Sequence, residues 1–110
     1  GNLKEALENS IRSGHLNICK YLVSLGVTNF NRALMTAAIY DQLEICKYLV
    51  SVGATDFNKA LVSAAERGNL KICKYLVSLG ANNFDVALYW TPLHTKMYLT
   101  EQKHLYKLNN

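Results

Sequence analysis

The chain has 110 residues, of which 50% are hydrophobic and 18% are charged, and its formal net charge is +4. This composition suits one continuous hydrophobic core, and no stretch approaches the run of about 18 apolar residues that a membrane-spanning helix needs. We therefore expect a single domain over residues 1–110, with no membrane as a partner.

An internal repeat organises most of the chain. The segment Ile-Cys-Lys-Tyr-Leu-Val-Ser begins at Ile18, Ile45 and Ile72, so the interval is 27 residues both times. A fixed period of this kind is typical of helix-turn-helix repeats, in which each unit buries its apolar face only by stacking on its neighbours. The sequence predicts three repeats, at residues 3–29, 30–56 and 57–83, and a divergent unit at residues 84–110.

Each repeat is predicted to contain two short helices. In the first helix of the second repeat, Leu34, Ala37 and Ala38 lie three and four residues apart and share one face. The second helix has apolar residues on two adjacent rows, which predicts a helix covered on two sides, and Gly53 ends it by supplying a left-handed residue. We expect the equivalent residues Asn31, Asn58 and Asp85 to cap the first helices of their units.

The divergent unit is predicted to be built differently. Thr91 and Pro92 stand where the middle repeats carry Ala pairs, and proline in a helix interior costs about 3 kcal/mol. Proline suits the first position of a helix, so we expect these two residues to cap and begin one. Its apolar side chains would cover the last repeat while its lysines face water, as a terminal repeat requires: Leu93, Met97, Leu105 and Leu108 inside, and Lys96, Lys103 and Lys107 outside. Docking of a partner is the alternative role for this unit.

These residues resemble a known family. Gly68-Asn-Leu-Lys-Ile-Cys-Lys-Tyr-Leu-Val-Ser-Leu-Gly-Ala81 resembles the second half of an ankyrin repeat, and Gly14-His15-Leu16 matches that family's Gly-His-Leu turn. The resemblance covers about residues 3 to 90 and implies an all-α, ankyrin-like helix-turn-helix repeat solenoid of about three repeats plus a divergent C-terminal capping unit.

Two features depart from the usual pattern of that family. Ankyrin repeats run about 33 residues, so roughly six are absent here, at the place where the family forms a projecting β-hairpin. Asp41 stands where Gly14 and Gly68 stand, so we expect it to adopt a positive φ. Short repeats rich in Asn, Lys, Tyr and Ile also resemble those of proteins from large DNA viruses or AT-rich microbes.

Three cysteines, Cys19, Cys46 and Cys73, occupy equivalent places in successive repeats. Helix packing would hold their backbones about 8 to 10 Å apart, which exceeds the reach of about 7 Å of a disulfide. Zinc sites use closely spaced ligand pairs, which this sequence lacks. We expect buried free thiols with no metal and no cofactor, and hence a reducing intracellular location, the cytoplasm, which would be that of a host cell if the protein is viral.

The charges favour no continuous basic surface. The second repeat carries 2 basic and 3 acidic residues, whereas a nucleic-acid-binding stripe would be basic along the whole stack. The one regular basic feature is a column formed by Lys20, Lys47 and Lys74 with a tyrosine beside each, and we interpret it as a solvated face in which lysines lie over neighbouring rings. The alternative is electrostatic binding of nucleic acid or another polyanion by this lysine column.

The near-identical middle repeats differ most where Ile39 and Tyr40 in one correspond to Glu66 and Arg67 in the other. In ankyrin repeats these positions lie on the concave side and commonly contact partners, so the resemblance implies the same here. An exposed apolar and aromatic pair is a typical anchor for a protein partner, although the pair could instead pack against adjacent loops. The candidate partner-binding residues are Arg12, Ser13, Asn31, Ile39, Tyr40, Asn58, Glu66, Arg67 and Asp85.

No set of residues indicates catalysis. His15 lies in the Gly-His turn, where the resemblance implies a backbone-bonding role, and nothing in the sequence places a nucleophile and an orienting acid beside it. We therefore expect a non-enzymatic module or scaffold that binds an unidentified protein through the concave face of its first helices, with no small-molecule substrate.

Overall fold

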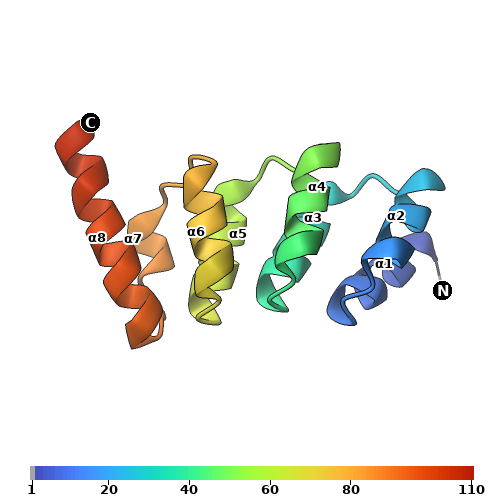
Figure 1. Ribbon diagram of the computed structural model, residues 1–110, viewed down its shortest axis with the longest axis horizontal. Helices are drawn as coiled ribbons and strands as arrows, with labels where there is room; N and C mark the ends of the chain where they lie inside the picture. The colour runs from blue at the N-terminus through green and yellow to red at the C-terminus, as the bar shows by residue number, and fades with distance from the viewer. Residues whose placement is uncertain (1) are drawn as a thin grey trace. The chain divides into compact units, whose positions relative to one another are not determined.

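The computed structural model describes residues 2–110, and these residues form α-helices without any β-strand (Figure 1). This confirms the all-α expectation, and the connection over residues 25–29 is a turn followed by an irregular loop, with no strand in it. The helices within the described residues are α1 (Leu3–Arg12), α2 (Leu16–Ser24), α3 (Phe30–Ile39), α4 (Leu43–Val52), α5 (Phe57–Glu66), α6 (Leu70–Ser78), α7 (Phe84–Ala87) and α8 (Leu93–Asn109).

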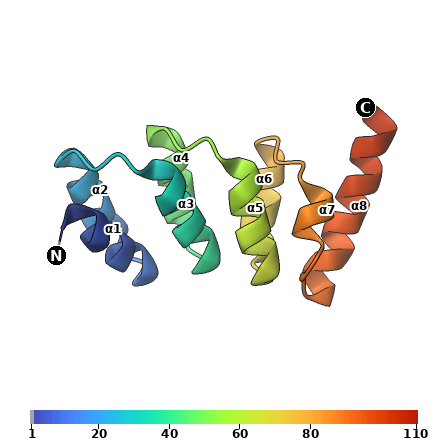
Figure 2. The ribbon, with the colours of Figure 1, turned by 180° about the vertical axis from the view of Figure 1, so that it is seen from behind.

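The helices group in consecutive pairs, and the chain divides into two compact units after Asp56, at a repeat boundary. In the first unit, α1 packs against α2 and α3 against α4, while α3 also packs on α1 and α4 on α2. In the second unit, α5 packs against α6 and α7, and α7 packs against α8. Figure 2 shows α1 and α3 lying side by side, with α2 and α4 behind them. That residues 1–110 form one domain stays a prediction.

The turn between the two helices of a repeat needs a residue with a positive φ. Gly14 has φ 76° and Gly68 has φ 69° in the first and third repeats, and Asp41 adopts φ 58° in the second. Asp tolerates the left-handed region better than most residues with a Cβ, which is why the turn survives without glycine. The expectation of a positive φ at Asp41 is confirmed.

The core follows the apolar positions that the repeats share. Leu34, Ala37 and Ala38 are fully buried on α3, and Leu49 is fully buried on α4. Because alanine has only a methyl side chain, the Ala pair lets α3 approach its neighbours closely. The three cysteines are free and fully buried, at the same place in α2, α4 and α6, as predicted: Cys19, Cys46 and Cys73.

The capping expectation for Asn31 is wrong. α3 begins at Phe30 and its N-cap is Asn29, so Asn31 lies inside the first turn. Its side-chain oxygen instead accepts hydrogen bonds from the backbone N–H groups of Thr55, at 2.7 Å, and Asp56, at 3.0 Å. Asn31 therefore ties the start of its own repeat to the loop that ends it, because those loop N–H groups have no helical acceptor.

The same correction applies in the second unit. The side-chain oxygen of Asn58, in α5, accepts from the N–H groups of Asn82, at 2.8 Å, and Asn83, at 3.2 Å. The carboxylate of Asp85, in α7, pairs with the ammonium of Lys103 in α8 instead of capping a helix. Asn58 repeats the loop-tying role of Asn31, whereas Asp85 joins two helices of its unit.

The fourth unit differs from the repeats, and a helix begins directly after Thr91 and Pro92, but these two residues have other roles than the sequence predicts. α7 ends after four residues, and the Thr91 hydroxyl donates to the carbonyl of Ala87, so Thr91 closes α7 rather than capping α8. Pro92 is the N-cap of α8, and its carbonyl accepts from the N–H of Lys96 at 2.8 Å. Pro92 therefore precedes the first helical position, where its missing N–H costs nothing.

The predicted inner face of α8 is also wrong. Its buried residues are Thr95 and Leu99, whereas the four apolar residues expected to cover the last repeat are exposed: Leu93, Met97, Leu105 and Leu108. Lys103, expected to face water, is half-buried at its ion pair with Asp85. α8 packs against α7, and the side of α8 that is buried lies opposite to the side that the sequence pattern favoured.

Candidate functional site

The residues that vary between repeats lie at the C-terminal ends of the first helices. Arg12 is the last residue of α1, Ile39 is the last residue of α3 and Tyr40 is the C-cap that follows it. In the second unit, Glu66 is the last residue of α5 and Arg67 comes directly after it. The 27-residue period places them at two adjacent positions of the repeat: Arg12, Ile39 and Glu66 at the first, and Ser13, Tyr40 and Arg67 at the second. The candidate residues at these helix ends are Arg12, Ser13, Ile39, Tyr40, Glu66 and Arg67.

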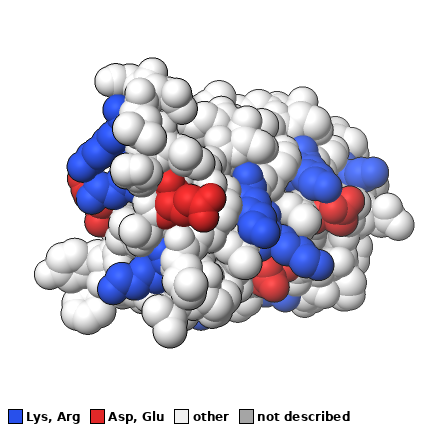
Figure 3. Space-filling model, turned by 60° about the vertical axis from the view of Figure 1, so that its left-hand side comes forward, with Lys and Arg blue, Asp and Glu red and all other residues white. Residues whose placement is uncertain are grey.

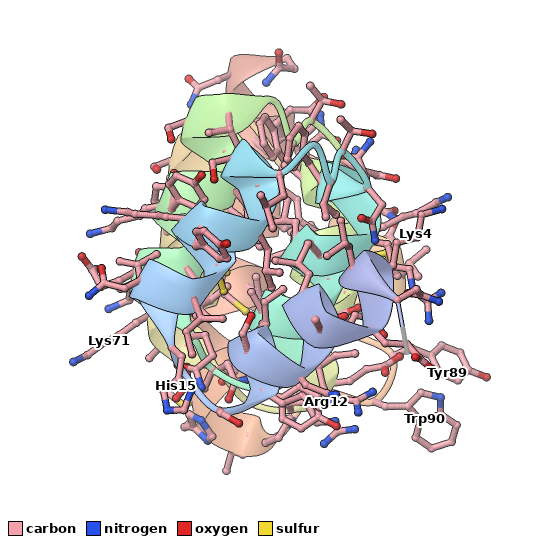
Figure 4. All side chains as sticks on the ribbon, turned by 90° about the vertical axis from the view of Figure 1, so that its right-hand side faces the viewer. Lys4, Arg12, His15, Lys71, Tyr89 and Trp90 are labelled. Carbon is pink, nitrogen blue, oxygen red and sulfur yellow. The ribbon has the colours of Figure 1, made fainter. Side chains whose placement is uncertain are left out.

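In the first unit the structure brings two of these residues together. The guanidinium carbon of Arg12 lies 5.6 Å from the centre of the Tyr40 ring, which is within the range of a cation–π contact. Arg12 is exposed, and 44% of Tyr40 remains accessible, so the ring keeps a free surface beside the cation. Arg12 and Tyr40, called the Arg12–Tyr40 pair below, form an exposed group of aromatic and cationic character. Arg12 lies at the end of α1 in Figure 4.

Polar contacts between the repeats hold this pair in place. The side-chain nitrogen of Gln42 donates to the carbonyl of Arg12 at 3.4 Å, joining the turn after α3 to the end of α1. The Arg32 guanidinium donates to the carboxylate of Glu8 at 2.6 Å, joining α3 to α1. The end of α1 and the end of α3 are thus fixed to each other by more than the ring contact.

Ile39 and Tyr40 differ in their surroundings. Ile39 is half-buried, so part of its side chain packs within the unit. Tyr40 is exposed and meets Arg12 rather than a loop. Tyr40 is therefore the better candidate anchor for a partner.

In the second unit, Glu66 and Arg67 are both exposed at the end of α5. The turn beside them contacts the start of α8, because a ring nitrogen of His94 lies 2.9 Å from the carbonyl of Gly68. A Cβ added at Gly68 would lie 2.9 Å from the His94 ring, so the close approach of these segments depends on glycine there. His94 is a residue that the sequence reasoning did not connect with this end of the helices.

Asn31, Asn58 and Asp85 are exposed, but a side-chain oxygen of each already has a partner within the chain. The side-chain oxygens of Asn31 and Asn58 accept hydrogen bonds from backbone N–H groups of the loops. The Lys103 ammonium holds the pKa of the Asp85 carboxyl below its usual range, mainly by hydrogen bonding and then by its charge. Binding a partner through these atoms would require giving up those bonds, so they are weaker candidates than the Arg12–Tyr40 pair.

Two lysines of the lysine column, Lys20 and Lys74, lie over tyrosine rings. The Lys20 ammonium lies 5.7 Å from the centre of the Tyr48 ring in the first unit. The Lys74 ammonium lies 5.6 Å from the Tyr98 ring in the second unit. Lys47 pairs with Glu44 at 3.4 Å. Acidic side chains lie among the basic ones on the face that Figure 3 turns forward, where α8 is nearest the viewer.

The three cysteine thiols are buried, and burial disfavours their reactive thiolate form. Burial raises the pKa of Cys46 and of Cys73 to about 12, and it raises that of Cys19 as well. The Ser10 hydroxyl lies 3.1 Å from the Cys19 sulfur and partly opposes the effect of burial. Among the described residues, no cluster of His, Cys, Asp or Glu could hold a metal ion. Within residues 2–110, no helix is long and apolar enough to cross a membrane.

The sequence reasoning overlooked one exposed aromatic pair. Tyr89 and Trp90 are 74% and 73% exposed, and their rings meet edge to face at 5.0 Å between centres. They occupy the connection between α7 and α8 and project from the rest of the molecule (Figure 4). The signal was present, since Trp90 is the single tryptophan of the chain and stands where the repeat pattern breaks.

Comparisons with known proteins agree with this architecture. A family model described as ankyrin repeats in three copies matches residues 2–60 and, in an overlapping match, residues 34–99. The two matches together span most of the chain, including α7 and the start of α8. No curated protein matches the chain in a sequence comparison.

Proposed function

Because the chain belongs to the ankyrin-repeat family, we propose that it binds another protein through the C-terminal ends of its first helices, on the side that is concave in ankyrin repeats. Ankyrin repeats are generally protein–protein interaction modules and are typically non-enzymatic. The partner is an unidentified protein.

The observation that carries this proposal is the Arg12–Tyr40 pair. Most other positions repeat from unit to unit and specify the fold, whereas the equivalent positions 12, 39 and 66 carry Arg, Ile and Glu, and positions 13, 40 and 67 carry Ser, Tyr and Arg. The fold does not need a tyrosine at position 40, because the equivalent residue Arg67 likewise follows a well-formed first helix. A residue that varies while the fold persists is free to serve recognition.

The chemistry of the pair suits a protein surface. Tyrosine and arginine are enriched among the residues that contribute most to protein–protein binding. The ring offers apolar area and the guanidinium offers hydrogen-bond donors of fixed geometry, which suits a partner with an acidic group beside an apolar one. Because Arg12 already lies over the ring, less side-chain freedom is lost when the partner binds.

A second class of partner, nucleic acid or another polyanion at the lysine column, has weaker support. Lys20 and Lys74 lie over tyrosine rings and Lys47 lies beside Glu44, so the column is not a row of uncommitted cations. The buried free thiols fit a reducing compartment, and we place the protein inside the cell, in the cytoplasm, on that ground.

The test is a capture experiment from a cell lysate, with wild-type protein and two variants immobilised in parallel. Tyr40→Ala should weaken capture of the partner by about 2 kcal/mol, which is roughly a thirtyfold loss of affinity, because it removes the anchor. Lys20→Ala, which removes a neighbouring cation–π contact of the same kind, is the matched control and should leave capture unchanged.

The melting temperatures of both variants should stay close to that of the wild type, since both positions are on the surface. If Lys20→Ala abolishes capture, and capture by the wild type fades between low and moderate salt, the polyanion alternative replaces this proposal.

A further inference from the structure

In the second and third repeats, two backbone N–H groups of the loop that ends the repeat share one acceptor, the side-chain oxygen of an asparagine. Asn31 supplies this oxygen in the second repeat, at 2.7 and 3.0 Å, and Asn58 supplies it in the third, at 2.8 and 3.2 Å. In the first repeat the equivalent residue is Lys4. An ammonium group donates hydrogen bonds and cannot accept them, so Lys4 cannot replace the asparagine oxygen.

The loop of the first repeat keeps the same backbone conformation without this acceptor. The N–H of Phe30 donates to the carbonyl of Thr28 at 2.8 Å, and the equivalent bond in the third repeat has the same length. Asn29 has φ −78° and ψ 59°, and its equivalent, Asn83, has φ −80° and ψ 56°. Among the described residues, the N–H groups of Thr28 and Asn29 have no hydrogen-bond acceptor. Two donors that meet one oxygen in the other repeats are therefore held here without it.

These donors border a shallow hollow on the surface. Residues 2–4 and 25–28 line it, so Thr28 and Lys4 share one space, and both are exposed. Successive backbone N–H groups beside a concavity bind anions, and a neighbouring cation strengthens the hydrogen bonds to a negatively charged oxygen. The hollow therefore combines two fixed donors with one mobile positive charge.

The missing acceptor is a property of the residue at position 4. Asn31 and the N–H groups that it accepts belong to the same repeat, residues 30–56, and those of Asn58 likewise lie within residues 57–83. A preceding repeat therefore plays no part in this contact. The exchange of asparagine for lysine leaves two donors and a positive charge where the other repeats are paired and neutral.

We propose that the N–H groups of Thr28 and Asn29, together with the Lys4 ammonium, bind a carboxylate group of a peptide. These three groups are called the Lys4 site below. A carboxylate resembles the carboxamide of Asn31, because each presents an acceptor oxygen on a planar carbon, and its charge adds attraction to the lysine. The carboxylate comes either from an acidic side chain of the peptide or from the end of its chain, which share this chemistry.

The Lys4 site is separate from the Arg12–Tyr40 pair. Lys4 is the second residue of α1 and Arg12 is the last, so they lie at opposite ends of that helix (Figure 4). Eight residues of α-helix rise by about 12 Å along the axis. The two proposals therefore succeed or fail independently.

The test follows backbone amide signals by nuclear magnetic resonance while sodium acetate replaces sodium chloride, at neutral pH and constant ionic strength. The signals of Thr28 and Asn29 should shift along a saturable curve. Those of Thr55 and Asp56 should stay in place, because Asn31 already accepts from them. Inorganic phosphate, titrated in parallel, is the competing oxyanion.

Two substitutions of Lys4 separate the role of its charge from that of the N–H groups. Lys4→Ala removes the cation and leaves both donors available, so acetate should bind about two- to fivefold more weakly. Lys4→Asn restores the oxygen of the other repeats, so acetate binding should be lost, and this variant should melt at a higher temperature than Lys4→Ala. Lys71→Ala removes the same charge at an exposed position of α6 and should bind acetate like the wild type.

Two blocked amino acids then identify the source of the carboxylate. Aspartate blocked at both backbone ends offers only a side-chain carboxylate, whereas glycine blocked at its amino end offers only a terminal one. The compound that saturates the shifts at the lower concentration names the preferred group. The proposal is wrong if neither compound binds, if the signals of Thr28 and Asn29 do not respond to acetate, or if they respond to phosphate alone. Acetate binding by Lys4→Asn as tight as that of the wild type would equally contradict it.

Discussion

The side-chain oxygen of Asn31 accepts a hydrogen bond from the backbone N–H of Thr55 at 2.7 Å, across 24 residues of chain. Asn58 and Asn82 make the same contact in the second unit, at 2.8 Å and with the same separation. Backbone N–H groups of a loop, which have no acceptor within a helix, are thereby bonded at the same point in two repeats. The contact fixes where one repeat ends without any β-hairpin.

Removing this side chain should destabilise the first unit. Asn31→Ala leaves the N–H groups of Thr55 and Asp56 without their acceptor, and we expect the free energy of unfolding to fall by about 1 to 2 kcal/mol. Asn31→Asp keeps an oxygen acceptor and should retain most of the stability. Urea denaturation measures both, with Asn17→Ala, at an exposed position of α2, as the control. Equal results for Asn31→Ala and Asn17→Ala would contradict this role.

A core position and a surface position of α4 should respond very differently. Leu49 is fully buried, so Leu49→Ala should leave a cavity and cost about 2 to 5 kcal/mol. Lys47 is about half exposed and its pair with Glu44 spans three residues on the helix surface, so Lys47→Ala should change stability by less than about 0.5 kcal/mol. Thermal and urea unfolding of the two variants compare these costs. Similar losses would mean that the assignment of helix faces is wrong.

The thiols should react slowly in the native protein. Cys46 and Cys73 are buried and their pKa values are raised to about 12, so near neutral pH almost none of either is the reactive thiolate. A chromogenic thiol reagent should label all three cysteines promptly in denaturant and only slowly without it. Rapid labelling of the native protein, or stoichiometric zinc in it, would be inconsistent with buried structural thiols.

Stability should fall in alkaline solution. The pKa of Cys46 rises from about 9 in the unfolded chain to about 12 in the fold, mainly because burial disfavours the thiolate. Below pH 9 both states keep the proton and stability is unaffected by this group. Between pH 9 and pH 12 only the unfolded chain releases it, so the free energy of unfolding decreases as pH rises.

Tyrosines and lysines also titrate in that range, so the measurement is a comparison. Urea unfolding of the wild type and of Cys46→Ala from pH 8 upward should show a shallower decline for the variant, since one titrating thiol is gone. Parallel declines would show that Cys46 does not contribute.

Much of the fold could be predicted from the sequence because the same 27-residue pattern occurs three times in it. The 27-residue period located the helix pairs, and the spacing of Leu34, Ala37 and Ala38 identified a buried face. The equivalence of Asp41 with two glycines identified a left-handed turn residue. These are local properties, because helix periodicity and turn sterics act within a few residues of the chain.

The sequence located the residues of the candidate site but did not predict which of them are in contact. The departures from repetition placed Arg12, Tyr40 and Arg67 at the ends of the first helices, where the structure has them. That Arg12 lies over the Tyr40 ring depends on the distance between α1 and α3, which no single helix encodes. The Arg12–Tyr40 contact is therefore a product of repeat packing.

Tertiary structure alone decided the roles of Asn31 and of α8. An asparagine near the start of a helix can cap that helix or accept hydrogen bonds from a distant loop. Only the position of Thr55 beside Asn31 in the fold selects the second role. Apolar residues occur on more than one side of α8, so its sequence permits several rotations. In the structure Leu99 is buried and Leu93 and Leu108 are exposed, because packing within the unit decides which side of the helix is covered.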